Sequence, residues 1–448
     1  TSLSGHLTVI VQNNVTEPAG VPTFLNSISS CPGGPYKVTV QPDAATVRTV
    51  SGNVSAPGLL SFDQVNRFNI DGRFGGTGNY LTFNNTNGSS AVVYYSNNSA
   101  GDTIRNATLQ ANNTAIGSGI IHLATSAAAG GGNSNMLFTS NNIGGSGLSA
   151  NGILSSGSAG ALNQNNDITN NNIFNFGSTT NGSGISVSAT GNGGNWTITG
   201  NSLYNPVNSG AGGQTGISFL PGAGVNDNVI NSNYIGGTAA LAAGDWENSS
   251  GGTIAGARLN AGTVQFDGNT VRNIRSTSNL QGAVLGVDVL GTTSATVTNN
   301  TFTALYSDGG YMYATGGGIW CIWFGIGCYY YPVGDAGYAM AVNSNTSSPI
   351  VITGNTLNGI GTTYYTTGPI DPGIYVHGGY ARAINHTGSG SFTIDNNTIG
   401  WVPVSNTNAN FTTSASIFVN NTGLGSPVTG CSISNNTIEG PSAIGAGE

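Results

Sequence analysis

Apolar and polar residues follow one another along this chain in a short motif that returns many times. The motif reads apolar-x-x-Asn-x-apolar and is often preceded by glycine or asparagine. Through the middle of the chain its asparagines return roughly every 30 residues, a spacing typical of solenoid proteins. The motif occurs at Met136–Ile143, Asp167–Ile173, Thr197–Leu203, Val229–Ile235, Val264–Val271, Thr296–Phe302, Val351–Leu357, Thr393–Ile399 and Ser432–Ile438.

A second set of short segments lies between these motifs and also alternates apolar with polar residues, as a strand with one buried face does. These segments begin at Gly152, Gly184, Gly216, Gly256, Gly373 and Ser416. Long runs with the helical period of 3.6 residues are almost absent. The pattern therefore predicts an all-β chain that forms a right-handed parallel β-helix. From about Val54 onward we expect roughly 10–12 coils, about 50–60 Å tall at the usual strand spacing.

The repeated asparagine has a physical role in such a fold, because a side-chain amide donates and accepts hydrogen bonds at once. Amides that stack on successive coils, about 4.8 Å apart, form a ladder. Asparagine and glycine also tolerate the left-handed backbone of a sharp corner. A sugar-reading array is the less favoured alternative. The predicted ladder residues are Asn142, Asn172, Asn201, Asn233, Asn269, Asn300, Asn355, Asn397 and Asn436.

The repeat divides the chain into two regions. Residues 1–53 are expected to hold N-terminal strands and a partial cap, with one or two helical turns between Pro22 and Ser30. Residues 54–448 are expected to form the β-helix, with insertions near 303–340 and 361–372. The first insertion is an aromatic loop, and such a loop folds onto the wall of the solenoid, contacts a second subunit or binds sugar.

The composition narrows the classes of partner. Charged residues make up 6% of the chain, the net charge is −8 and Lys37 is the sole lysine. A basic patch that could follow a phosphate backbone is lacking, so we expect no nucleic-acid partner. The apolar runs are also shorter than the roughly 20 residues that span a bilayer, so we expect no membrane insertion.

Four cysteines are compatible with disulfides in an oxidising compartment. Cys321 and Cys328 bracket the aromatic loop and are predicted to form a disulfide within it. Cys31 and Cys431 lie at opposite ends of the predicted solenoid, so each is expected to be a free buried thiol or to take part in a bond between subunits. The histidines lack ligand spacing to the cysteines, so neither a metal nor a cofactor is expected.

Three stretches of the chain resemble a known family. Phe68–Gly72, Asn226–Gly237 and Phe266–Ile274 resemble the large β-strand-repeat, right-handed β-helix surface proteins of Bacteroidota. The likeness covers most of Val38 to Thr301. It implies an extracellular protein, often exported with a C-terminal sorting domain that is then removed. The family mostly lacks an assigned activity, so the resemblance lends little support to a catalytic role. Asp102–Ile104 also matches the short O-glycosylation pattern of these bacteria, which makes Thr103 a candidate acceptor.

Polysaccharide lyases and glycoside hydrolases need several acidic groups on one face of neighbouring coils. The acidic residues here are thinly spread, and the best cluster contains Asp371, His377, Arg382 and His386 within one coil and its loop. A second grouping places Asp267 and Asp288 near Arg258 and Arg272 in sequence. The favoured interpretation is that these residues satisfy corners and walls, and that no catalytic site exists.

Asn-x-Ser/Thr triplets are plentiful, although a chain rich in asparagine and threonine produces them by chance. An asparagine that faces the core cannot carry a glycan. The candidate acceptors are Asn53, Asn84, Asn97, Asn181, Asn195, Asn248, Asn345, Asn385 and Asn410.

The sequence favours a secreted or surface-bound structural protein whose subunits polymerise head to tail into a fibre or coat. The physical reason is that the ends of a β-helix expose unpaired strand edges. A strand such as Leu7–Val11 of the next subunit could pair with the last regular coil. Two alternatives remain: an adhesin or glycan-binding β-helix, and a polysaccharide lyase or glycoside hydrolase.

Overall fold

The structure is a computed structural model of the chain. It describes residues 2–20, 24–27, 29–127, 132–178, 182–188, 190–207, 212–278, 282–308, 310–316, 329–332, 337–362, 374–378, 380–400, 402, 415–420 and 430–439. Apart from one short 3-10 turn, η1 (Ala240–Ala242), the regular elements of these residues are strands. Successive coils build three long sheets, called sheets 1, 2 and 3 in the order in which the chain visits them, and every described coil but the last contributes a strand to all three.

Sheet 1 has 13 parallel strands. They are β2 (Leu7–Val11), β6 (Val38–Pro42), β9 (Phe68–Asp71), β12 (Thr103–Arg105), β15 (Leu137–Thr139), β18 (Asp167–Thr169), β21 (Thr197–Thr199), β24 (Asn228–Asn231), β28 (Thr263–Asp267), β31 (Ser294–Thr298), β36 (Ile350–Thr353), β40 (Phe392–Asp395) and β43 (Ser432–Ser434).

Sheet 2 has 14 strands. Along its path lie β3 (Val15–Gly20), β7 (Arg48–Val54), β10 (Leu81–Asn85), β13 (Ala107–Ala111), β16 (Asn142–Ile143), β19 (Asn172–Phe174), β22 (Ser202–Tyr204), β25 (Tyr234–Ile235), β29 (Thr270–Ser276), β32 (Thr301–Ser307), β37 (Thr356–Thr362), β41 (Thr398–Ile399) and β44 (Thr437–Ile438). The remaining strand, β26 (Trp246–Asn248), pairs with β29 beside this path.

Sheet 3 has 12 strands. They are β4 (Phe24–Asn26), β8 (Gly58–Asp63), β11 (Ala91–Ser96), β14 (Ile121–Leu123), β17 (Asn151–Ser155), β20 (Gly182–Val187), β23 (Gln214–Gly222), β27 (Ile254–Ala261), β30 (Ala283–Gly291), β35 (Tyr338–Thr346), β39 (Tyr380–His386) and β42 (Ala415–Val419). Two further short strands, β1 (Ser2–Leu3) and β5 (Ser29–Ser30), pair with each other.

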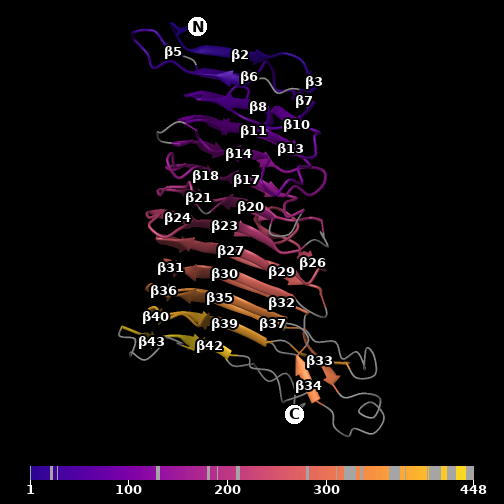
Figure 1. Ribbon diagram of the computed structural model, residues 1–448, viewed down its shortest axis with the longest axis vertical. Helices are drawn as coiled ribbons and strands as arrows, with labels where there is room; N and C mark the ends of the chain where they lie inside the picture. The colour runs from indigo at the N-terminus through magenta and orange to yellow at the C-terminus, as the bar shows by residue number, and fades with distance from the viewer. Residues whose placement is uncertain are drawn as a thin grey trace.

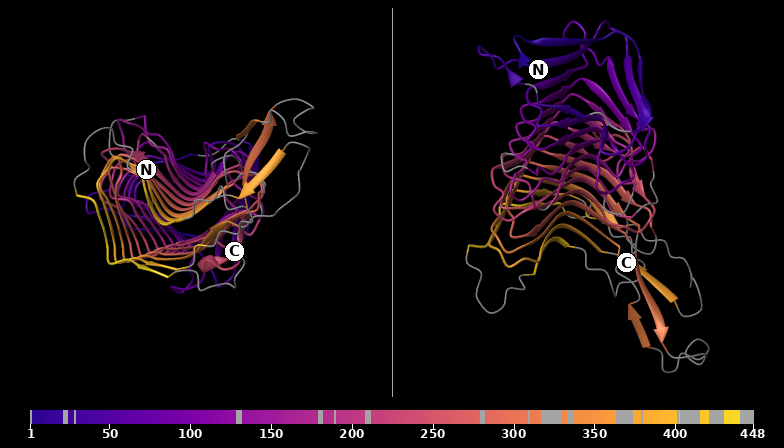
Figure 2. Two further views of the ribbon diagram at one scale, coloured as in Figure 1. Left: turned by 90° about the horizontal axis from the view of Figure 1, so that it is seen from below. Right: turned by 45° about the horizontal axis from the view of Figure 1, so that its top comes forward.

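The three sheets together confirm the predicted parallel β-helix. Successive strands follow the same path around a common axis, so residues at one position of each coil form a column (Figures 1 and 2). One such column of sheet 1 runs through Ile104, Phe138, Ile168 and Ile198, which are fully buried. A matching column of sheet 2 runs through Leu109 and Ile143. The apolar half of each motif is therefore the core of the solenoid.

The solenoid begins earlier than the sequence analysis placed it. β2 pairs in parallel with β6, and β6 pairs with β9, so the first coils belong to the same three sheets. The expected helical turns between Pro22 and Ser30 are wrong, because Phe24–Asn26 is strand β4 and pairs with β8. Leaving out β2 and β6, eleven strands of sheet 1 follow, within the 10–12 coils expected from Val54 onward.

The aromatic insertion contributes a small separate sheet. β33 (Gly310–Gly316) pairs antiparallel with β34 (Tyr329–Pro332) and with β38 (Ile374–Gly378). Figure 1 shows β33 and β34 beside the C-terminal coils and apart from the stacked sheets. The segment after Gly373, expected to be a wall strand, is instead β38 of this small sheet, and β39 supplies the wall strand of that coil.

Candidate functional site

A continuous ladder of buried asparagines lies at the corner between sheets 1 and 2. In each coil the amide Nδ2 donates to Oδ1 of the asparagine one coil further on, over distances of 2.9–3.1 Å. The backbone N–H of each asparagine donates to the same Oδ1. Its members are Asn141, Asn171, Asn201, Asn233, Asn269, Asn300, Asn355, Asn397 and Asn436.

Seven of the nine predicted ladder residues are therefore confirmed, and two are wrong by one position. Asn142 and Asn172 begin strands of sheet 2 and point outward, where Nδ2 of Asn172 donates to Oδ1 of Asn142. The residue before each ladder asparagine determines which asparagine turns inward. In every coil of the ladder this preceding residue has a left-handed backbone, with φ between 52° and 68°. Asn170 takes this conformation, so Asn171 enters the ladder.

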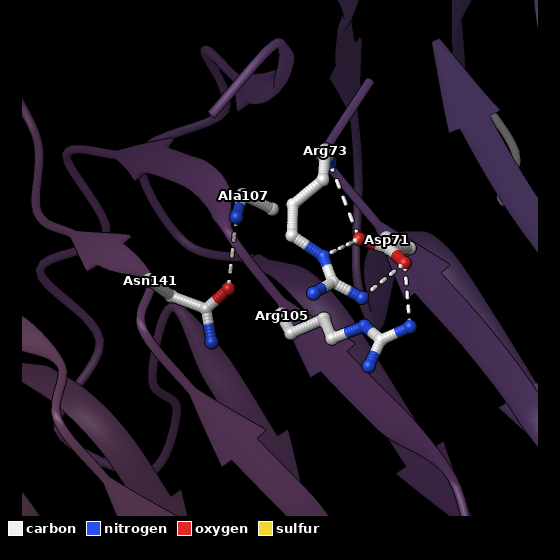
Figure 3. Close-up of polar contacts among 5 residues, drawn as sticks. All are labelled: Asp71, Arg73, Arg105, Ala107 and Asn141. Atoms are coloured by element: carbon white, nitrogen blue, oxygen red, sulfur yellow. Dashed lines mark hydrogen bonds and ion pairs between the residues drawn. The ribbon is translucent and has the colours of Figure 1, made fainter. Parts of the chain in front are cut away.

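The first ladder residue, Asn141, lies on the coil that follows a charged cluster on the third and fourth coils (Figure 3). Oδ1 of Asn141 accepts a hydrogen bond from the backbone N–H of Ala107, which fills the ladder position one coil earlier. On the neighbouring strands Asp71 is nearly buried and binds Arg73 at 2.8 Å and Arg105 at 2.6 Å. Burial opposes ionisation of Asp71, but the hydrogen bonds from the two arginines hold its pKa below the usual value.

Other arginines are likewise held by aspartates. Arg48 binds Asp43 at 2.7 Å, and Arg275 binds Asp308 at 2.8 Å. Arg272, which the sequence grouped with nearby acids, donates instead to the carbonyls of Leu241 and Ala242. Arg272 and Arg275 thus link neighbouring coils, while the pair of Arg48 and Asp43 lies within one coil.

The N-terminal end of the solenoid leaves its apolar columns open. Val9 and Val15 start the core columns of sheets 1 and 2, and each is 42% exposed. A cavity of about 590 Å³ opens among the first coils and is lined by apolar residues that include Val40, Phe62 and Phe83. The end of a solenoid that is covered by a cap would bury these side chains.

The C-terminal coil shows the same exposure. Ile433 and Ile438 end the core columns of sheets 1 and 2 and are 51% and 52% exposed. Within the described residues, β43 and β44 each pair on one side only. In the part of the chain that the structure describes, both ends thus present a strand edge together with apolar side chains.

The outer face of sheet 3 carries a second candidate site, a line of polar side chains on consecutive coils. Nε of Arg258 on β27 lies 3.2 Å from Asp288 on β30. Nδ2 of Asn343 on β35 donates to the other oxygen of Asp288 at 2.7 Å. Asn385 on β39 donates to Asn343 at 2.6 Å, and Arg382 donates to Asn385 at 2.7 Å. All donations run toward Asp288, so one carboxylate ends the chain of hydrogen bonds.

This line borders a cavity of about 550 Å³. Arg258, Asp288 and Asn343 form one wall, while Leu285 and Tyr338 provide apolar surface beside them. Burial raises the pKa of Asp288 despite the hydrogen bonds from Asn343 and Arg258. A site of this kind can hold a small polar ligand that has one apolar face.

The predicted catalytic cluster is not assembled by the described residues. Asp371 lies outside them, and of His377 only the backbone is described, in β38. Arg382 is held by Asn385, and its guanidinium stacks 3.5 Å from the ring centroid of Phe418. His386 is fully buried 3.1 Å from the hydroxyl of Ser344, and burial lowers its pKa.

The second predicted grouping is half right. Arg258 pairs with Asp288, whereas Asp267 accepts hydrogen bonds from Thr298 and Asn299. Asn343, which donates to Asp288, and Asn385, which donates to Asn343, were not predicted from the sequence. The 30-residue separation of Arg258 and Asp288 equals the repeat length, which is the signal that places them side by side.

A serine and a histidine also meet on the outer face of sheet 3. Nε2 of His122 lies 3.0 Å from Oγ of Ser156, and the ring packs edge-on against Tyr94. Burial lowers the pKa of His122 to about 4, so its ring is neutral at pH 7. A nucleophilic triad needs a third group that orients the histidine. The contacts described for His122 are those with Ser156 and Tyr94, so this pair is a structural contact.

Cys31 and Cys431 are free thiols, but the expectation of burial is wrong for Cys431, which is exposed, while Cys31 is half-buried. The predicted disulfide between Cys321 and Cys328 lies outside the described residues.

Burial separates the candidate glycosylation sites. Asn248 and Asn385 are buried and their amides are hydrogen-bonded, so neither can carry a glycan in the folded protein. Asn53, Asn195 and Asn345 are exposed, whereas Asn84, Asn97 and Thr103 are half-buried. Asn181 and Asn410 lie outside the described residues.

Comparison with known proteins gave no relative: no protein-family model matches the chain, and neither does any curated protein. Among the described residues, no three histidine, cysteine, aspartate or glutamate side chains gather where they could hold a metal ion. The described part of the chain also has no helix long and apolar enough to cross a membrane.

Proposed function

We propose that this protein is an extracellular structural subunit that assembles end to end into a fibre or surface coat and has no catalytic activity. The observation that carries the proposal is the exposure of the same core columns at both ends of the solenoid. Val9 and Val15 start these columns, and Ile433 and Ile438 end them, each about half exposed.

An open strand edge is a template for another strand, since its N–H and C=O groups lack partners. The best partner for such an edge is a surface with the same cross-section, and a second copy of the chain has it. The two ends differ from each other, so the contact is heterologous and repeats into a filament rather than closing into a dimer.

The location outside the cell is part of the proposal. Its support is the low charge of the chain and the asparagine ladder, whose hydrogen bonds hold neighbouring coils together. The likeness of Phe68–Gly72 and related stretches to Bacteroidota surface proteins points in the same direction.

Light scattering and negative-stain imaging over a range of protein concentrations test the proposal. The intact protein should form filaments whose length grows with concentration. Val9→Asp and Ile438→Asp should each keep it monomeric, because a charge at either end opposes burial of that end. Ile116→Asp is the matched control, since Ile116 is 56% exposed in a turn far from both ends. A protein that stays monomeric at every concentration contradicts the proposal.

A second candidate function is glycan binding in the outer cavity of sheet 3. It is favoured because the cavity lining combines the polar side chains of Arg258, Asn343 and Asn345 with those of Tyr338 and Leu285, since sugars have polar edges and apolar faces. The described lining contains one carboxylate, Asp288, whereas glycoside hydrolysis uses two.

Affinity electrophoresis against a panel of neutral and acidic polysaccharides tests this second function. Tyr338→Ala and Asn345→Ala should each weaken retention at least severalfold. Thr169→Ala, on the outer face of sheet 1, should not change it. Equal retention of all three variants would exclude this cavity as the binding site.

A further inference from the structure

The two ends of the solenoid expose strands that belong to the same columns, and this determines how two copies can fit together. The inference rests on the proposed end-to-end assembly and specifies its contact. Strand pairing can be followed from coil to coil along sheet 1, from Thr8 through every strand to Ser432. Thr8 and Ser432 therefore occupy one column.

Neighbouring residues follow the same register. Val9 and Ile433 share the central core column of sheet 1, which contains Ile104, Phe138 and Ile198 between them. Leu7 and Cys431, two residues before Val9 and Ile433, share the adjacent inward column. In the stacked arrangement, strand β2 of the second copy would pair in parallel with β43, in the same way as β43 pairs with β40.

Sheet 2 gives an independent match. Its central core column begins at Val15, passes through Val50 and Phe83, and ends at Ile438. Val9 and Val15 lie in the first coil, and Ile433 and Ile438 lie in the last. A second copy whose Val9 lies beside Ile433 therefore has its Val15 beside Ile438. Stacking in this register buries two half-exposed apolar pairs in a single step.

This register also brings an asparagine of the second copy beside the last ladder residue, although Gln12, which precedes it, lacks the left-handed backbone found before each ladder residue. Asn436 holds the last rung, where its Oδ1 accepts from both the backbone N–H and Nδ2 of Asn397. Asn13 lies two residues before Val15 of β3, as Asn436 lies two residues before Ile438 of β44. Arg48, Leu81 and Ala107 occupy the same column in the next three coils, so the neighbour of Asn13 in that column is not an asparagine. It is exposed and available to a second copy.

A shifted register would lose these matches. A slip of one residue turns each core side chain to the outer face. A slip of two residues keeps apolar side chains inward but places the ladder asparagine against a strand residue, which leaves buried amide groups without partners.

We propose that a second copy of this chain stacks in register on the C-terminal coil, with its β2 on β43 and its β3 on β44, so that sheets 1 and 2 run on from subunit to subunit and its Asn13 lies beside Asn436. Cys431 then lies directly beside Leu7 of the next copy, at the spacing of about 4.8 Å between neighbouring strands. That spacing is within the range of Cα separations that a disulfide bridges.

The test is oxidative cross-linking of assembled Leu7→Cys protein in a Cys31→Ser background. We expect a ladder of reducible dimers and larger species on a non-reducing gel, with a bond between positions 7 and 431 identified by peptide mapping. Val9→Cys is the register control, because position 9 lies about 8 Å from Cys431 in the proposed register, beyond the reach of a disulfide.

The outcomes separate the two proposals. The register is contradicted if filaments of Val9→Cys cross-link and filaments of Leu7→Cys do not. It is also contradicted if filaments of neither variant cross-link. Imaging of each variant before oxidation shows whether it still assembles. The intact chain's failure to assemble at all overturns the proposed function itself.

Discussion

Replacing one member of the buried asparagine ladder should destabilise the protein far more than replacing the asparagine next to it. Oδ1 of Asn171 accepts from the backbone N–H of Asn141 and from its Nδ2, both at 3.0 Å. Asn171→Ala leaves the backbone N–H of Asn141 and one of the two hydrogens on its Nδ2 without a partner, while the other amide hydrogen still donates to the carbonyl of Ile104. An unsatisfied buried donor costs about 1–3 kcal/mol, so we expect a loss of about 2–6 kcal/mol in the free energy of unfolding.

Asn172→Ala is the matched control, with the same chemical change one residue later. Asn172 is half-buried on the outer face and makes one hydrogen bond, to Asn142 at 2.9 Å. Water can replace this bond, so the loss should stay below about 1 kcal/mol.

Urea unfolding followed by circular dichroism, at a protein concentration below that of assembly, measures both variants. Hydrogen exchange at the amide of Asn141 gives a local reading, which should speed up in Asn171→Ala and not in Asn172→Ala. Equal losses in the two variants, or a larger loss for Asn172→Ala, would refute the reasoning.

Three further predictions follow from buried groups. Burial raises the pKa of Asp102 to about 8, from about 3.8 for an exposed aspartate, so the folded state binds a proton there that the unfolded chain releases. Stability should therefore fall as the pH rises between these values, by up to about 1.4 kcal/mol per pH unit. Asp102→Asn keeps the oxygen that accepts from Phe68 N–H and should remove this pH dependence. Its urea midpoint should be higher at pH 7 but not at pH 4. An unchanged slope of stability against pH would count against a protonated Asp102. Pectin and alginate should not be cleaved with or without calcium, and release of new reducing ends or unsaturated uronate that Asp288→Asn abolishes would argue for an enzyme. Peptide mapping of protein from its natural source should find no glycan on Asn248 or Asn385, and a glycan on either would show that the buried placement is incorrect.

The sequence predicts the fold well, because a repeat states the same structural rule many times. The spacing of Asn201, Asn233 and Asn269 is enough to predict one stacked column, and the structure has it. Where asparagines follow one another without interruption, as in Asn170 to Asn172, the motif cannot indicate which one turns inward. The left-handed backbone of Asn170 decides that, and it depends on the geometry of the corner.

The outer line on sheet 3 was harder to predict from sequence. Arg258 and Asp288 are one repeat apart, but Asn343 and Asn385 follow insertions that change the spacing to 55 and 42 residues. Only the pairing of β30 with β35 and of β35 with β39 brings them into line. The N-terminal strands were similarly difficult, since Phe24–Asn26 is too short to show a period and gains its strand partner from β8.

The axial repeat of assembled protein, measured by fibre diffraction or helical image reconstruction, tests the central claim most directly. Thirteen coils at about 4.8 Å each predict a subunit repeat of about 62 Å, with strong diffraction along the fibre axis at the strand spacing. Filaments with this repeat would mean that the β-helix continues through the contact from copy to copy. Filaments without axial diffraction at the strand spacing, or protein that remains monomeric, would contradict an account built on the open ends of the solenoid.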